Sequence, residues 1–317
     1  MHTCPPPTGT LAEYLDANGT IRGNYGHLLL ELKKAIDDNL IDGLRSYFES
    51  AHLDAREHFH EQIGLSLHPD AGAGVVPAVY PNCLPPKAHR GLFGEVVAGL
   101  TTEAYRDAYV GKHSWKVPIF LFRHHDDVER YLWTLNFDPE RRREIYGRHG
   151  SDFIGIALNA QGEVVRIIVG EAKWRSQLTQ SVANNLLLGE KETDEATGES
   201  AHNGRGIWFG LNRDTPLPHG LRQLQRLLEL RDPDGHASAI FSIDQAVLGT
   251  VPAPPRTNLV LLIGNAGKTR KPLDVLVDWE QLPKEYTAPH DLQVVEVILE
   301  KGDTLIDGRY TSLWQGE

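Results

Sequence analysis

The chain has 317 residues, of which 40% are hydrophobic and 24% are charged, a composition typical of a folded globular protein and not of a disordered chain. This length predicts about two domains or one elaborated domain. The formal net charge of -11 argues against a protein that coats nucleic acid through a global positive field. Any nucleic-acid substrate therefore has to be met by a local groove or by a partner.

The two cysteines of the chain, Cys4 and Cys83, lie in proline-rich segments and show neither zinc-finger nor CxxC spacing. The sequence does not begin with a basic region followed by an apolar run. The longest apolar run, NLVLLIG, is far shorter than the ~18 residues that a membrane span requires. We therefore expect a cytoplasmic protein that is neither exported nor membrane-spanning.

The first third of the chain divides by composition into two parts. Residues 11–63 carry apolar positions at helical spacing with little strand signal, which predicts a helical N-terminal part over residues 1–65. Residues 66–90 are dense in Pro, Gly and Ala and predict an irregular connection. Residues 91–317 are expected to form a second unit that opens with a helix in LFGEVVAGLTTEAYRDAY.

The second unit has a mixed pattern of strands and helices. Two β-rich runs, Phe153 to Leu158 and Val164 to Val169, flank the turn-like NAQG and predict a hairpin. Helical spacing is expected in WRSQLTQSVANNLLLGE, PHGLRQLQRLLELRD and SAIFSIDQAVLG, and strands in KVPIFLF, TNLVLLIG, LDVLVDW and DLQVVEVILEKG. The predicted fold class is α/β (α+β), with a central mixed sheet flanked by helices and antiparallel strands at its centre.

The hairpin brings charged residues together at its open end. If Ala160 faces Glu163 across the turn, paired residue numbers add up to 323, and Asp152 faces Glu171. Side chains alternate along a strand, so Lys173 shares the face of Glu171. A one-residue bulge would break this register.

Two neighbouring carboxylates repel each other unless a cation lies between them, and hard oxygen ligands suit Mg²⁺ or Mn²⁺. An ammonium group beside that cation can orient an attacking water or offset charge on a phosphate. The alternative is that these residues are solvated charges or a cross-strand ion pair. The apolar run RIIV before Glu171 and Lys173 favours a central strand, where an isolated solvated pair is less expected.

SDFIGIALN followed by VVRIIVGEAKW resembles the core of the PD-(D/E)xK nuclease superfamily. Asp152 matches the first-strand acid of that superfamily, and Glu171 and Lys173 match its E-x-K, although Ser151 replaces the usual Pro. The resemblance implies a restriction-endonuclease-like domain that hydrolyses phosphodiesters with Mg²⁺ (or Mn²⁺) held by Asp152 and Glu171. It also implies that an upstream helix can supply another acid, and RGLFGEVVAGL offers Glu95 as a further catalytic residue and metal ligand. The alternative is that Glu95 is a partly exposed helix residue with no part in the site.

The order of elements is also similar to the HamA nuclease subunits of Hachiman-type antiphage systems, in which an FGE-bearing helix precedes the strands. LFGE and VGEAKW carry this resemblance, which covers roughly residues 90 to 300. It implies DNA as the substrate in preference to RNA, and a helicase-like protein partner. The competing hypothesis is a non-catalytic nucleic-acid-binding or adaptor subunit of a defence or repair complex.

Several polar residues around the hairpin are candidates for nucleic-acid contact. The cluster RRREIYGR directly precedes Asp152 and could line the entrance to the site. Gln177 and Gln180, expected on the first helical turns after Lys173, could reach a phosphate or the attacking water. Polar side chains on the solvent-facing side of a helix would explain them equally well. The predicted contact residues are Arg141, Arg142, Arg143, Arg148, Arg175, Gln177 and Gln180.

Overall fold

The computed structural model describes residues 1–66, 80–122, 153–194, 198–213, 217–218 and 220–315. The strands are β1 (Leu15–Arg22), β2 (Tyr25–Leu32), β3 (Trp115–Lys116), β4 (Phe153–Leu158), β5 (Val164–Leu178), β6 (Lys191–Thr193), β7 (Ser200–His202), β8 (Arg256–Ala266) and β9 (Asp291–Leu299). The helices are α1 (Thr8–Tyr14), α2 (Asp38–Ser66), α3 (Pro86–Ala104), α5 (Gln180–Leu188), α6 (Ile207–Leu211), α7 (Leu221–Arg231), α8 (Ala237–Val247) and α9 (Gly302–Ser312), with short 3-10 turns η1 (Arg106–Ala108) and η2 (Val110–Lys112).

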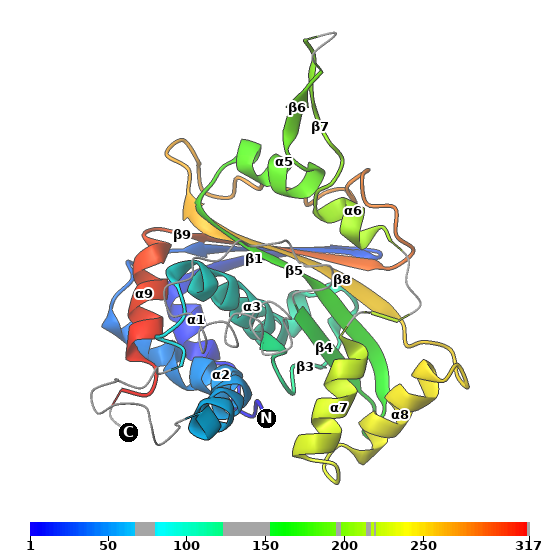
Figure 1. Ribbon diagram of the computed structural model, residues 1–317. Coiled ribbons are helices and arrows are strands. Elements are labelled where there is room, and N and C mark those ends of the chain that lie inside the picture. The colour runs from blue at the N-terminus through cyan, green and yellow to red at the C-terminus, as the bar shows by residue number, and fades with distance from the viewer. Residues whose placement is uncertain (67–79, 123–152, 195–197, 214–216, 219, 316–317) are drawn as a thin grey trace.

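Seven of these strands form one mixed sheet in the order β1-β2-β9-β8-β5-β4-β3. The neighbours β2, β9, β8 and β5 are parallel, whereas β1, β4 and β3 each pair antiparallel with the strand beside them. Helices lie on both sides of this sheet, and the β6–β7 hairpin projects away from it (Figure 1). The predicted α/β (α+β) class with a central mixed sheet is confirmed. The expectation of antiparallel strands at its centre is wrong, because the central strands are parallel and the antiparallel pairs lie toward the two edges.

Apolar residues on the two faces of the sheet build separate parts of the core. On one face α2, α3 and α9 pack over even-numbered residues of β5, including Ala172 and Trp174. On the other face α7 and α8 cover Ile167 and Val169, while α5 and α6 pack over β8 residues such as Leu262. The two faces of β5 therefore lead to different layers of helices, because side chains alternate along a strand.

The helical prediction for the N-terminal part is right for α2 and wrong for residues 15–32. Those residues form the β1–β2 hairpin, with a two-residue turn in which Gly23 has a φ of 60°. The run Leu28 to Leu30 is fully buried, because β2 lies between β1 and β9. A short apolar run of this kind fits a buried strand as well as a helix, and the distant partner β9 decides between them.

Of the helices and strands predicted for the second unit, some are confirmed and others are shorter, shifted or absent. The helices α7 and α8 and the strands β8 and β9 are confirmed. β5 continues through Leu178, so the helix expected directly after Lys173 begins only at Gln180, where the Thr179 hydroxyl accepts a hydrogen bond from the Val182 amide. The strand expected in KVPIFLF is limited to Trp115–Lys116, and LDVLVDW forms no strand in the described structure.

Candidate functional site

The β4–β5 hairpin has the predicted register over most of its length. Phe153 pairs with Gly170 and Ala157 pairs with Arg166, and the residue numbers of each pair add up to 323. The register prediction is therefore confirmed from Phe153 to Ala157. Asp152, the next residue outward, lies outside the described residues, as do Arg141, Arg142, Arg143 and Arg148.

The turn reaches this register by a different route from the predicted one. Leu158 pairs with Val164, one residue out of step, and a bulge that follows restores the register. Asn159 closes the loop, because its side-chain oxygen accepts hydrogen bonds from the backbone N–H groups of Gln161, at 3.0 Å, and Glu163, at 2.9 Å. The predicted pairing of Ala160 with Glu163 is wrong, but the bulge compensates for the error.

Glu171 and Lys173 form an ion pair on one face of β5. The Lys173 Nζ lies 2.5 Å from Glu171 Oε2, and the two side chains are 32% and 24% exposed. Ala172 between them is buried against the layer that contains α3. The prediction that Glu171 and Lys173 share a face of β5 is confirmed. It is the face of the sheet on which α5 and α6 pack in one cluster and α7 and α8 in another.

The backbone around this pair is tightly held on one side. A side chain at Gly170 would place its Cβ 1.9 Å from the Leu259 carbonyl oxygen, so only glycine fits there. Glu171 and Lys173 pair in register with Val260 and Leu262 of β8. Among the described residues, β5 has no strand on its other side beyond Gly170, because β4 begins at Phe153. The E-x-K pair thus lies directly beyond the last described pair of the hairpin, Phe153 with Gly170.

Glu95 lies on α3 and is only 3% exposed. The helix begins at Pro86, a residue suited to the first helical turn, and packs through Gly94, where an added Cβ would be 3.5 Å from the Ala172 Cβ. Burial is the main cause that raises the pKa of Tyr80 and of Tyr310, and Glu95 is one of the weaker causes. Glu95 is thus carried by the helix that packs on the Ala172 face of β5, and its role as a metal ligand stays a prediction.

The remaining predicted contact residues have different surroundings. Arg175 is exposed, and its guanidinium donates a hydrogen bond of 2.8 Å to the Trp174 carbonyl. Gln177 is exposed on β5 and not on a helical turn. Gln180 donates from Nε2 to the Leu276 carbonyl at 2.9 Å, which ties α5 to the segment before β9. Gln180 therefore has a structural partner in addition to any contact with substrate.

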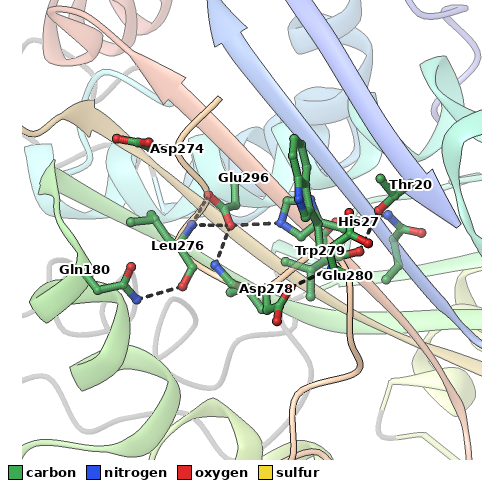
Figure 2. A network of polar contacts seen from close by, with 12 residues as sticks. Thr20, His27, Gln180, Asp274, Leu276, Asp278, Trp279, Glu280 and Glu296 are labelled. Atoms are coloured by element: carbon green, nitrogen blue, oxygen red, sulfur yellow. Dashed lines mark hydrogen bonds and ion pairs between the residues drawn. The ribbon is translucent and has the colours of Figure 1, made fainter. Parts of the chain in front are cut away.

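Sequence reasoning missed a buried polar contact between the neighbouring strands β2 and β9. His27 Nε2 lies 3.0 Å from Glu296 Oε1, and both side chains are fully buried. The Glu296 carboxylate also accepts hydrogen bonds of 2.8 to 3.0 Å from the backbone N–H groups of Leu276 and Val277. Figure 2 shows the contacts of Glu296 with His27 and Leu276. The signal was a lone Glu within the apolar run VVEVIL. This network holds residues 276–277 against the sheet.

The described residues contain no group of three or more His, Cys, Asp or Glu side chains that could hold a metal ion. Glu171 supplies one hard carboxylate ligand of the kind that Mg²⁺ prefers. Two such carboxylates on one face would suit the ion, and the second predicted one, Asp152, lies outside the described residues. The donor chemistry fits Mg²⁺ or Mn²⁺ only with Asp152 included.

A second buried polar cluster joins α2 to α9. His52 Nδ1 lies 2.8 Å from the Tyr80 hydroxyl and Nε2 lies 3.2 Å from the Tyr310 hydroxyl. Burial first, and then the positive charge of His89, lower the pKa of His52 from 6.5 to about 3. Folding therefore keeps His52 neutral at pH values where the unfolded chain binds a proton.

We expect this difference to make stability depend on pH. The contribution of neutral His52 is fully present above pH 6.5 and is lost progressively as the pH falls toward 3, by up to ~1.4 kcal/mol per pH unit. Urea unfolding over a pH series should show a weaker dependence for His52→Gln. The matched control is His60→Gln, because His60 is exposed on the same helix. Equal pH dependence in the wild type and in His52→Gln would contradict the expectation.

No protein-family model matches this chain, and the search of curated proteins also finds no match. Of the helices in the described parts of the chain, none combines the length and the apolar character needed to cross a membrane.

Proposed function

We propose that the protein is a metal-dependent nuclease whose site comprises Asp152, Glu171 and Lys173. The observation that carries the proposal is the half-buried Glu171–Lys173 pair, which lies one residue beyond the last described hairpin pair, Phe153 and Gly170. Continuing that register by one residue would set Asp152 opposite Glu171 on the same face. Such an arrangement supplies two carboxylates and one ammonium group to a single location.

The chemistry follows from the residue types. Mg²⁺ or Mn²⁺, when bound by the two carboxylates, would lower the pKa of a water molecule and polarise a phosphate oxygen. The Lys173 ammonium lies within hydrogen-bond reach of Glu171, so it can hold the attacking water or offset charge that develops on the phosphate. Glu95 is buried on α3, which packs on the Ala172 face of β5, opposite to Glu171 and Lys173, so its proposed role as a fourth participant and metal ligand rests on the family resemblance alone.

We further propose that the substrate is DNA and that the protein is an effector of a bacterial antiphage system with a helicase-like partner. The resemblance to the Hachiman nuclease subunits supports this proposal. The net charge of -11 supports the need for a partner, because the field of the whole protein repels a polyanion. The isolated chain should then cut slowly until the partner presents the substrate.

The test is a cleavage assay with purified protein. Linear, supercoiled and single-stranded DNA, and RNA, are each incubated with Mg²⁺ or with EDTA, and with or without a co-purified partner and ATP. We expect cleavage that requires Mg²⁺, is slow for the chain alone and is faster with the partner. Fast cleavage by the chain alone would refute the need for a partner. Binding without cleavage under every condition would favour the adaptor hypothesis instead.

A further inference from the structure

The strand β1 forms one edge of the seven-stranded sheet, and no strand in the described part of the chain pairs with its outer side. The Tyr14 carbonyl accepts a hydrogen bond of 3.0 Å from the Lys33 amide, and the two are partners by the β1–β2 register. Hydrogen-bonded pairs alternate along antiparallel strands, so the even-numbered residues of β1 bond to β2. The N–H and C=O groups of Ala17, Gly19 and Ile21 therefore point away from the sheet.

These three residues are exposed to solvent. In the described part of the chain, no other backbone group is hydrogen-bonded to their outward N–H and C=O groups. β1 is eight residues long, has no bulge in its pairing with β2, and contains neither Pro nor Lys. Edge strands of monomeric proteins usually carry such protecting features. Ile21 is also 38% exposed, which adds an apolar contact to this edge.

The sequence of β1, LDANGTIR, is complementary to itself when a second copy runs antiparallel to it. With Gly19 opposite Gly19, Asp16 of each copy faces Arg22 of the other. In the same register Ala17 faces Ile21, and the remaining pair is polar on both sides. Outward-pointing residues then pair with outward-pointing residues, as an antiparallel ladder requires. Opposite charges and apolar groups are favourable cross-strand neighbours.

The present partners of the two charged residues do not prevent this pairing. Asp16 forms an ion pair of 3.0 Å with Lys33, and Arg22 forms one with Glu280. The side chains of Asp16 and Arg22 are 60% and 52% exposed, and ion pairs this exposed contribute little. Asp16 and Arg22 can therefore leave their present partners, or keep them, and still form an ion pair with a second copy.

We propose that two copies of this chain associate through β1, antiparallel about a twofold axis at Gly19, so that one sheet continues across both copies. The partner is a second copy because one register satisfies three conditions at once. In that register opposite charges face each other, the apolar residues face each other, and the outward N–H and C=O groups of the two β1 strands can pair. The strand that carries Glu171 is separated from β1 by three strands. The proposal is therefore independent of the proposed nuclease activity.

A charge exchange tests both the interface and its register. Sedimentation velocity over a concentration series should show a dimer for the wild type. Asp16→Arg and Arg22→Asp should each weaken it by at least ~10-fold, because two like-charge pairs replace two attractive ones. The double exchange, Asp16→Arg with Arg22→Asp, should restore it. The matched control is Asp42→Arg, which removes an exposed ion pair with Arg45 on α2 and should leave the dimer unchanged.

Cysteine cross-linking gives a second readout. Ala17→Cys with Ile21→Cys should form disulfides between copies under mild oxidation, because these positions face each other across the twofold axis in a hydrogen-bonded pair. Either single variant should give no such cross-link, and both retain Cys4 and Cys83 as internal controls. The proposal would be overturned if the wild type stays monomeric over the whole concentration series. It would also be overturned if neither single charge reversal weakens the dimer.

Discussion

Replacement of Lys173 by Met is expected to reduce Mg²⁺-dependent cleavage by at least ~100-fold, and Glu171→Gln is expected to do the same. Lys173→Met keeps a side chain of similar length but removes the ammonium group that contacts Glu171. Glu171→Gln keeps the shape of the side chain but removes a negative ligand. Initial rates of cleavage of the preferred DNA substrate, with the partner present, give the measurement.

Two controls separate a catalytic effect from an effect on folding. Lys191→Met removes an exposed lysine of β6, in the hairpin that projects from the body, and should cleave like the wild type. Thermal unfolding should show that Lys173→Met and Glu171→Gln remain folded, because their side chains are only partly buried. If both variants still cut at the wild-type rate with Mg²⁺, the assignment of the site is wrong.

Replacement of Glu296 by Ala is expected to lower the free energy of unfolding by about 3–5 kcal/mol. Glu296 is fully buried between His27 and the backbone of Leu276 and Val277. Its removal leaves the buried N–H group of Val277, the partly buried N–H group of Leu276 and an imidazole without their acceptor, and opens a cavity beside β9. Figure 2 shows that the same network continues to Gln180 on α5, so local order there should decrease as well.

Urea denaturation provides the measurement for this variant. The matched control is Glu300→Ala, because Glu300 is an exposed residue directly after the same strand and should change stability by no more than ~0.5 kcal/mol. His27→Leu should cost less than Glu296→Ala, because Glu296 keeps its backbone donors in that variant. A loss below ~1 kcal/mol for Glu296→Ala would show that the buried carboxylate does not hold this segment.

Local sequence determined the β4–β5 hairpin and the common face of Glu171 and Lys173. Strand alternation has a period of two residues, so once the strands are recognised the register follows from a few neighbouring residues. The amphipathic helix α7 was also predictable from a local period, because Leu221, Leu224 and Leu228 recur at helical spacing and are buried.

Only the tertiary structure decided what depends on residues far apart in the chain. The Leu28–Leu30 run became a strand because β9, more than 260 residues later, lies parallel to it. The burial of Glu296 was likewise decided by His27 on that partner strand and by Leu276 and Val277 in the segment before β9. The position of β1 at the edge of the sheet could not be predicted, because it depends on the order of all the strands. The alternation of residues within one strand does not indicate which strands become its neighbours.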